Sequence, residues 1–319
     1  MTAPRTPSVS VLVCVHNGER FLSATLDSAF AQTYSDFELI AVDDGSTDGS
    51  ARLLLDHGDP RLRYIRQENQ GAGAALRRAL CEARGQFIAL LDQDDLWTAD
   101  KLATHVEVLR SHPEIDLTFS WFQIINDAGQ EIGLHSNRHQ GTIDFRGLLV
   151  DFVIGASSNV VMRRDAIERA GGPDVSLPRL YDLDLCLRIA LLSPGNTMAI
   201  CRDLMLYRRH PVQITRDIQS LEQEWDRGWQ KWERLAPIDV AAAEKRGRSN
   251  MNRYFASLAY EQGSYSKGLA HLRTSFRRCP GFFLTDLRNW LTAAACLSGL
   301  ILPAKLHRKA ERLAGLRRE

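Results

Sequence analysis

An acidic cluster follows an apolar run in the first third of the chain. Residues 87–91 are apolar, and Asp92, Asp94 and Asp95 come directly after them. A run of this length is typical of a strand buried on both faces of a parallel sheet, and ligands bind at the carboxyl ends of such strands. Asp92 and Asp94 leave the strand end on the same side, where two carboxylates repel each other unless a cation lies between them. The pair therefore indicates a candidate cation site.

Two β-rich runs upstream, 9–15 and 37–42, also end in polar residues. These residues are His16, Asn17, Asp43 and Asp44. A carboxylate at a strand end can accept hydrogen bonds from a base imide or a ribose hydroxyl. Asn69 and Gly71 precede an expected helix and give a weak signal for a phosphate-binding loop. The sequence thus places ligand-binding residue types at several strand ends.

These polar residues also have ordinary structural explanations. Asp95 or Thr98 could cap a helix expected over 96–109, which would leave the other acids solvated. The segment 43–46 is typical of a turn followed by a helix cap. One segment alone does not decide between these interpretations, and the order of the surrounding elements must decide.

Strands and helices alternate along the first 91 residues. Expected strands cover 9–15, 37–42, 63–66 and 87–91, and expected helices begin near residues 19, 49 and 73. Alternation of this kind predicts an α/β fold with a mostly parallel central sheet flanked by helices. Right-handed crossovers return parallel strands in the same direction, so the polar residues should line one crevice.

The order of these motifs closely resembles that of the family 2 glycosyltransferases, which have the Rossmann-like GT-A fold. The matching segments are 9–18, 31–34, 37–48, 69–71 and 91–95. The resemblance implies that Asp44 contacts the base of a nucleotide sugar, that Asp92 lies near the ribose, and that Asp94 ligates Mn²⁺ or Mg²⁺ on the diphosphate. The expected nucleotide-sugar contacts are His16, Asn17, Glu19, Asp43, Asp44, Asn69, Gly71, Asp92 and Gln93.

A second acidic pair lies in residues 180–188, which resemble the helix that carries the catalytic base in that family. A Glu-Asp pair usually opens the helix, and registration on the residues downstream places Tyr181 at the Glu and Asp182 at the base. The missing Glu leaves its usual acceptor contact unassigned. The alternative is that Asp182 and Asp184 are solvated acids in a first helical turn, which is the preferred interpretation for Asp184.

Further downstream the resemblance is looser. Residues 155–164 resemble the segment that shapes the acceptor side, and His210 resembles a position that can touch the metal or the phosphates. The alternative for His210 is an ordinary surface histidine. Residues 213–216 are similar to a signature of processive synthases, but Asp217 replaces its Trp and no spanning helix is present. Single sugar additions are therefore expected.

Length and composition limit the possible classes. The chain has 319 residues with 40 Lys or Arg and 39 Asp or Glu, and its formal charge of +1 gives no global attraction to nucleic acid. This length predicts one larger domain, 1–215, and a smaller helical region, 216–319. The six cysteines include no CxxC pair and indicate reduced core thiols in a cytosolic protein. Residues 1–7 lack the apolar core of a signal peptide.

The C-terminal region is expected to be helical and to reach a membrane surface. Residues 256–279 resemble one helical hairpin of the tetratricopeptide kind. The apolar stretch 290–303 is too short to span a bilayer. The basic residues that follow it are Lys305, Arg308, Lys309, Arg312, Arg317 and Arg318. This pattern favours peripheral binding to an anionic membrane, and packing against the domain is the alternative.

Together these features predict an inverting, metal-dependent, non-processive glycosyltransferase. The expected donor is a UDP-sugar and the expected acceptor a hydroxyl of a glycan or lipid-linked molecule, in envelope polysaccharide or lipopolysaccharide synthesis at the cytoplasmic face of the inner membrane. The alternatives are a catalytically silent nucleotide-sugar-binding module and a nucleotidyltransferase. Intact Asp92, Asp94 and Asp182 argue against the first, and the absence of a basic Gly-rich loop after strand 9–15 argues against the second.

Overall fold

The structure, a computed structural model, describes residues 6–213, 216–303 and 306–307. The chain divides into two compact units, Met1–Phe145 with Val153–His210 and Arg146–Phe152 with Pro211–Glu319. No local pattern predicts that residues 146–152 group with the helical region, because their partners lie far along the chain. The side-chain amide of Asn250, for example, donates to the carbonyl oxygen of Val150 at 2.8 Å.

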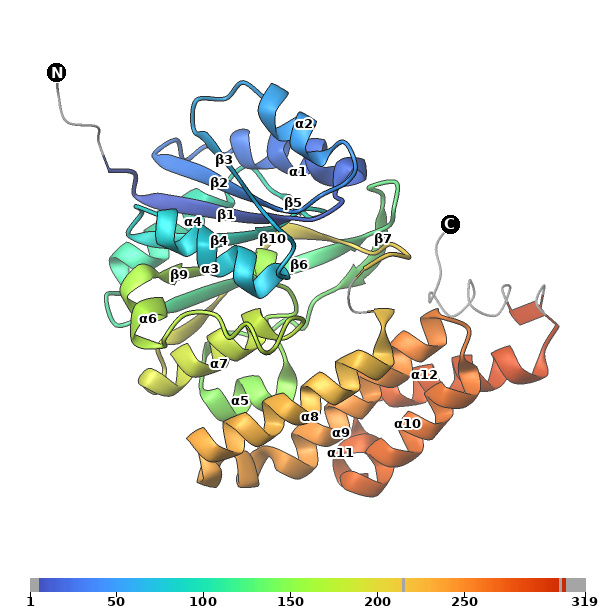
Figure 1. Ribbon diagram of the computed structural model, residues 1–319. Coiled ribbons are helices and arrows are strands. Elements are labelled where there is room, and N and C mark those ends of the chain that lie inside the picture. The colour runs from blue at the N-terminus through green and yellow to red at the C-terminus, as the bar shows by residue number, and fades with distance from the viewer. Residues whose placement is uncertain (1–5, 214–215, 304–305, 308–319) are drawn as a thin grey trace, which may run out of the picture. The chain divides into compact units, whose positions relative to one another are not determined.

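Within the described residues, the first unit is built on a ten-stranded sheet with the order β3-β2-β1-β4-β9-β6-β10-β5; β7 pairs with β6 and β8 with β10 (Figure 1). The strands are β1 Val9–Val15, β2 Phe37–Asp44, β3 Leu62–Gln67, β4 Phe87–Asp92, β5 Leu96–Trp97, β6 Leu117–Ile125, β7 Glu131–His135, β8 Gly141–Ile143, β9 Val160–Arg163 and β10 Thr197–Arg208. Strands β3, β2, β1 and β4 are parallel, as expected, whereas β9 runs antiparallel to β4 and to β6.

Helices cover both faces of this sheet and make the α/β class of the first unit plain (Figure 1). They are α1 Glu19–Phe30, α2 Ser50–Asp56, α3 Ala72–Glu82, α4 Lys101–Ser111, α6 Arg164–Arg169 and α7 Tyr181–Leu192, with the 3-10 turn η1 Ser157–Asn159. Alternate β1 side chains, from Val9 to Val15, pack with residues of α1, α2 and α4 in one core. The helices α3 and α7 lie on the other face. Buried strands between two helical layers explain the continuous apolar runs.

The helix expected over 96–109 begins later than expected. Leu96 and Trp97 form β5 and pair with Leu206 and Met205 of β10, so α4 starts only at Lys101. An apolar pair next to a helical pattern gives no sign of such a long-range pairing, which explains the error.

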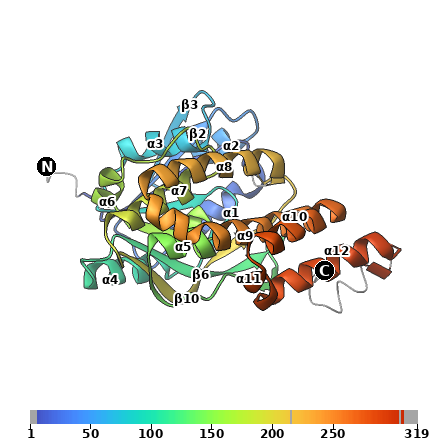
Figure 2. The same ribbon diagram turned by 90° about the horizontal axis from the view of Figure 1, so that it is seen from below.

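The second unit is helical. Its elements are α5 Phe145–Asp151, whose first residue belongs to the first unit, and α8 Ile218–Leu235, α9 Pro237–Glu261, α10 Tyr265–Arg278, α11 Pro280–Thr285 and α12 Leu287–Ile301. Its core contains three tryptophans of α8, with the ring centroids of Trp225 and Trp232 5.3 Å apart and Phe152 edge-on to Trp225 at 4.8 Å. The expected hairpin over 256–279 corresponds to the end of α9 and to α10. The helix α12 lies at the edge of this unit, beside α10 (Figure 2).

The structure also bears on the expectations for the cysteines and for membrane-spanning helices. The six cysteines, all within the described residues, are free thiols, but Cys81 and Cys201 are exposed rather than in the core. No helix among the described residues is long and apolar enough to cross a membrane. The six basic residues expected to follow the apolar stretch, from Lys305 to Arg318, lie outside the described residues.

Candidate active site

The ends of β1, β2 and β4 meet because these strands are neighbours in the sheet. The register places Val15 beside Asp43 and Cys14 beside Asp92. Gln93 then joins two of the strand ends. Its side-chain oxygen accepts from the His16 N–H at 2.9 Å and its side-chain nitrogen donates to the His16 carbonyl at 3.0 Å. The structure thus brings the residues after β1 and β4 together, as the topology predicted.

Three predicted contacts present exposed polar side chains at this edge. The His16 ring nitrogen Nδ1 lies 2.9 Å from the Asp44 carbonyl, and the Asn69 amide nitrogen lies 3.3 Å from His16 Nε2. Asn17 has φ of 52°, and its side-chain oxygen accepts from the Thr47 N–H at 2.8 Å. His16, Asn17 and Asn69 are all exposed and therefore accessible to a ligand.

Asp43 and Asp44 are buried and bind the protein's own loops. Asp43 accepts from the Ser46 N–H at 2.8 Å, which is the turn expected from the sequence, and from the Tyr64 hydroxyl at 3.1 Å. The two oxygens of Asp44 accept from the Gln67 side chain at 2.8 Å and from the backbone N–H groups of Gln70 and Gly71 at 2.9 and 2.7 Å. Gly71 has φ of 87°, a conformation that favours glycine, so Asp44 fixes the loop that leads into α3.

Glu19 points toward α2. Its Oε2 accepts from the Gly49 N–H at 3.0 Å, at the position that precedes the helix. A carboxylate there interacts favourably with the free N–H groups and the positive end of the helix dipole. A side chain on Gly49 would have to displace Glu19, since its Cβ would lie 2.2 Å from Oε1.

The three aspartates after β4 have different surroundings. Asp95 is buried and links distant elements: it accepts from the Ser158 hydroxyl at 2.6 Å and from the Arg208 N–H at 2.9 Å. Burial, with Asp94 and Asp92 nearby, raises the pKa of Asp95 well above its usual value. Asp95 does not cap α4, and its contacts are structural.

Asp92 lies beside Asp94 and near the start of α7. Its carboxylate accepts from the Ser157 hydroxyl. Burial and the charge of Asp94 raise the pKa of Asp92 to about 7, and the charge of Asp182 contributes in the same direction. Asp92, Ser157 and Tyr181 line one small cavity. Like charges therefore accumulate where the β4 end, η1 and the start of α7 meet.

Asp94 pairs with a histidine from the end of β10. Its Oδ2 lies 2.7 Å from His210 Nε2, and its backbone carbonyl accepts from Arg208 Nε at 2.8 Å. His210 is only 6% exposed and its ring centroid lies 4.8 Å from that of Phe21, so the surface-histidine alternative is wrong. The sequence separation of 116 residues hides this pair from any local pattern.

A carboxylate oxygen and an imidazole nitrogen are both donors that Mn²⁺ takes, and Mg²⁺ is commonly bound through one or two carboxylates plus substrate phosphates. No group of three or more His, Cys, Asp or Glu with metal-binding geometry occurs among the described residues. Asp94 and His210 could supply two ligands to a cation whose other coordination positions are taken by substrate oxygens and water. A cation there would also relieve the repulsion between the carboxylates of Asp92 and Asp94.

The two acids of α7 face different surroundings. Asp184 is fully buried, and its Oδ2 lies 2.8 Å from Nε of Arg188. Nη2 of Arg188 also donates to the Gly172 carbonyl at 2.6 Å. The expected solvated position of Asp184 is therefore wrong, because residues two apart on a helix point about 200° apart and this face of α7 turns to the core. Asp182 is half-buried.

The sequence interpretation missed several groups at the site. Ser157 and Ser158 bind Asp92 and Asp95 from η1, in a segment that was assigned only in general terms to the acceptor side. Tyr181, in place of the usual Glu, has a pKa raised well above its ordinary value by burial and by the charge of Asp92. Its hydroxyl thus stays protonated. The departure from the Glu-Asp pattern was the available signal.

A buried lysine of α4 forms a hydrogen bond with the last residue of η1. Lys101 is 0% exposed, donates from Nζ to the Asn159 carbonyl at 3.1 Å and lies 3.2 Å from Nε2 of His105. Burial lowers the pKa of Lys101 to about 7. Between pH 7 and the unfolded value of 10.5 the unfolded chain holds a proton that the folded chain has released, so stability should rise with pH across this window.

We therefore expect Lys101→Met to be more stable than the wild type at pH 7, by an amount that shrinks by on the order of 2 kcal/mol at pH 9. Chemical denaturation at the two pH values measures it. Lys245→Met, which changes an exposed lysine of α9, is the matched control and should show no such trend. An equal difference between Lys101→Met and wild type at both pH values would contradict a depressed Lys101 pKa.

A mixed α/β sheet with an Asp-x-Asp pair at the β4 end, followed along the chain by a helical region, is the arrangement expected of a glycosyltransferase of the GT-A fold. The model of glycosyl transferase family 2 matches residues 10–171, just over half of the 319 residues, and the chain belongs to this family. A curated relative, UDP-Glc:alpha-D-GlcNAc-diphosphoundecaprenol beta-1,3-glucosyltransferase WfgD of Escherichia coli, is 29% identical over 222 residues, 68% of this chain and 84% of that protein.

Solved structures agree with the fold. S. aureus TarS in complex with UDP-GlcNAc superposes with a TM-score of 0.64 at 15% identity, covering 96% of this chain and 92% of that one. The mannosyltransferase PcManGT from Pyrobaculum calidifontis, in complex with GDP-Man and Mn²⁺, gives a TM-score of 0.57 at 19% identity over 98% and 86% of the two chains. At these identities the likeness establishes the GT-A fold. The protein is an enzyme of the glycosyltransferase class.

Proposed function

We propose that the enzyme transfers one sugar from a nucleotide-diphosphate sugar to an acceptor hydroxyl, with a divalent cation and with inversion at the anomeric carbon. The observation that carries this proposal is the pairing of Asp94 with His210 at 2.7 Å, next to Asp92 and to the start of α7. Metal-binding donors and a second acid thus lie at one edge of the sheet.

Asp182 is proposed as the catalytic base. It accepts the proton of the acceptor hydroxyl while that oxygen bonds to the anomeric carbon and the bond from that carbon to the diphosphate breaks. Attack from the face opposite the diphosphate inverts the configuration. The start of α7 is close to the start of α3, which follows the loop at Asn69 and Gly71: a Cβ on Gly73 would lie 3.4 Å from that of Tyr181.

Asp94 and His210 would hold the cation, which when bound acts as a Lewis acid on the leaving diphosphate. Asp92 is proposed to lie near the ribose, positioned by its hydrogen bonds with Ser157 and Ser158. His16, Asn17 and Asn69 offer their exposed side chains to the nucleotide, and Asp44 is proposed to contact the base. Glu19, Asp43 and Gly71 shape the loops around them.

The donor is proposed to be a UDP-sugar and the acceptor a lipid-linked or envelope glycan. The names of the relatives support this choice: WfgD uses UDP-Glc and a diphosphoundecaprenol-linked acceptor, and the TarS structure contains UDP-GlcNAc. The PcManGT structure contains GDP-Man, so a GDP-sugar is the second candidate donor. An acceptor of this kind would place the enzyme at the cytoplasmic face of the inner membrane, held through the C-terminal segment.

Donor binding tests the proposal without knowledge of the acceptor. We expect one UDP-sugar of a panel to stabilise the full chain in the presence of Mn²⁺. At 100 times the dissociation constant the gain is about 2.7 kcal/mol, or roughly 5–10 °C in melting temperature. ATP and NAD serve as controls and should give no comparable shift. Absence of a shift with every UDP- and GDP-sugar, in a protein that melts cooperatively, would contradict the proposal.

A further inference from the structure

The helix α12 buries one face and leaves an apolar face open to solvent. Asn289, Ala295 and Cys296 are buried. The exposed large side chains are Leu287, Trp290, Leu291, Leu297, Leu300 and Ile301. Arg288, in the first turn, is the only charged residue in the helix sequence. On a helix of a soluble domain the open face normally carries the charges, so the pattern of α12 is reversed.

This open apolar face, which we call the α12 ridge, is continuous. Residues 287, 290, 291, 294, 297 and 301 follow helical spacing along one side. Leu284 of α11 and Leu302 extend it at the two ends. Single exposed apolar side chains are common, but a contiguous apolar surface marks a site of contact with a partner or a membrane.

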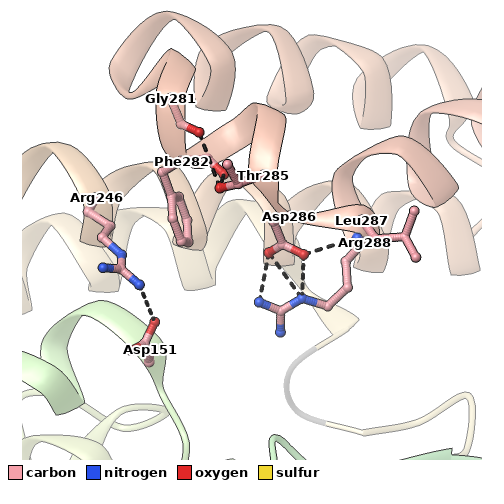
Figure 3. A pocket seen from close by; sticks show the side chains of 8 residues that line it. All are labelled: Asp151, Arg246, Gly281, Phe282, Thr285, Asp286, Leu287 and Arg288. Carbon is pink, nitrogen blue, oxygen red and sulfur yellow. Dashed lines mark hydrogen bonds and ion pairs between the residues drawn. The ribbon is translucent and has the colours of Figure 1, made fainter.

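Several charged residues pair with one another near the start of α12. Figure 3 shows a pocket in which Asp286 binds Arg288 at 2.7 Å and Arg246 stands 3.6 Å from Asp151. Arg246 also lies over the Phe282 ring at 4.7 Å. Asp286 caps α12 by accepting from the Arg288 N–H at 3.0 Å. Asp286 also lies 3.8 Å from Nε of Arg253, which joins the start of α12 to α9. Because these charges pair with one another, the pocket gives no sign of an anion site.

The distribution of charge along the chain indicates which kind of partner would bind the α12 ridge. Residues 265–319 carry eleven Lys or Arg and three Asp or Glu, a net charge of +8, whereas residues 1–264 carry 29 and 36, a net charge of −7. Among the described residues, Arg273, Arg277 and Arg278 of α10 are exposed. The exposed arginines of α10 and the apolar ridge of α12 are complementary to an anionic lipid bilayer. Two copies of a segment with a net charge of +8 repel each other.

We propose that the α12 ridge inserts into the surface of an anionic bilayer, with α12 lying parallel to the membrane plane. Its 15 residues extend roughly 22 Å, less than the hydrocarbon thickness of about 30 Å, so the helix lies in the interface. Trp290 offers a large apolar ring to the interface, and its N–H already donates to the Leu284 carbonyl at 3.2 Å. The inference deepens the proposed function and rests on it for the lipid-linked acceptor.

The test is flotation of the full chain with vesicles of phosphatidylcholine and phosphatidylglycerol, compared with phosphatidylcholine alone. The variant Leu287→Glu with Ile301→Glu changes two side chains that are 67% and 75% exposed, so the fold should tolerate it. The matched control, Leu55→Glu with Ile238→Glu, changes side chains that are 66% and 80% exposed on α2 and α9.

We expect the wild type and the control to float with anionic vesicles, the α12 variant to bind at least tenfold more weakly, and 0.5 M NaCl to weaken binding. Equal flotation of the two variants, or no flotation of the wild type, overturns the proposal. A wild-type dimer that the α12 variant converts to a monomer, without vesicle binding, would assign the ridge to self-association and also overturn it. Donor-dependent thermal stabilisation of the α12 variant, measured without vesicles, separates this outcome from a failure of the proposed function.

Discussion

Asp94→Asn is expected to lose sugar transfer by about 10³-fold or more. A neutral amide is a weaker ligand for a hard divalent ion than a carboxylate, and the charge stabilisation that a cation gives the leaving diphosphate is worth several kcal/mol. The 2.7 Å contact between Asp94 and His210 shows that the two proposed metal ligands already face each other. Turnover measured against Mn²⁺ concentration should show no recovery in the variant at any accessible concentration.

Asp27→Asn provides the control for Asp94→Asn, because it makes the same chemical change on an α1 side chain that is 73% exposed. It should keep wild-type turnover and the wild-type Mn²⁺ dependence. Near-normal turnover of Asp94→Asn in the presence of a chelator would remove Asp94 and its cation from the mechanism.

Asp182→Asn is expected to lower turnover at least about 10²-fold, because the amide keeps the shape of the side chain and cannot accept the acceptor proton. Donor affinity should change little, since the proposed contact of Asp182 is with the acceptor. Acceptor-dependent turnover and donor affinity, measured on the same preparations, separate the two effects.

Asp184→Asn makes the informative comparison. In the structure Asp184 forms a buried ion pair with Arg188, which Asp184→Asn breaks. Breaking such a pair typically lowers the free energy of unfolding by roughly 3–5 kcal/mol. The variant should melt earlier yet turn over when folded. Asp165→Asn, an exposed acid in the first turn of α6, controls for a generic loss of helix-start charge. A dead but stable Asp184→Asn beside an active Asp182→Asn would reverse the assignment of the base.

The strand ends were predictable because a buried parallel strand and the turn after it leave local signals. The apolar runs that became β1, β2 and β4 stop at the polar residues that the topology then gathers. The positions of His16 and Asn17, directly after β1, follow from that order.

The remaining errors concern contacts over long sequence distances. Asp95 and Asp92 look equivalent in the sequence, but Arg208 and Ser158 fix Asp95 in the core from elements over 60 residues away. Leu96 and Trp97 were assigned to a helix because their partners on β10 lie about 110 residues later. Asp184 looked solvated because nothing local shows which side of α7 meets the core.

Release of UDP from a UDP-sugar, followed with and without a lipid-linked glycan acceptor, tests the central claim most directly. We expect acceptor-dependent release by the wild type that disappears in a chelator, returns with Mn²⁺, and is absent in both Asp94→Asn and Asp182→Asn. Acceptor-dependent release that persists in the chelator, or that both variants retain, would rule out metal-dependent transfer with Asp182 as the base.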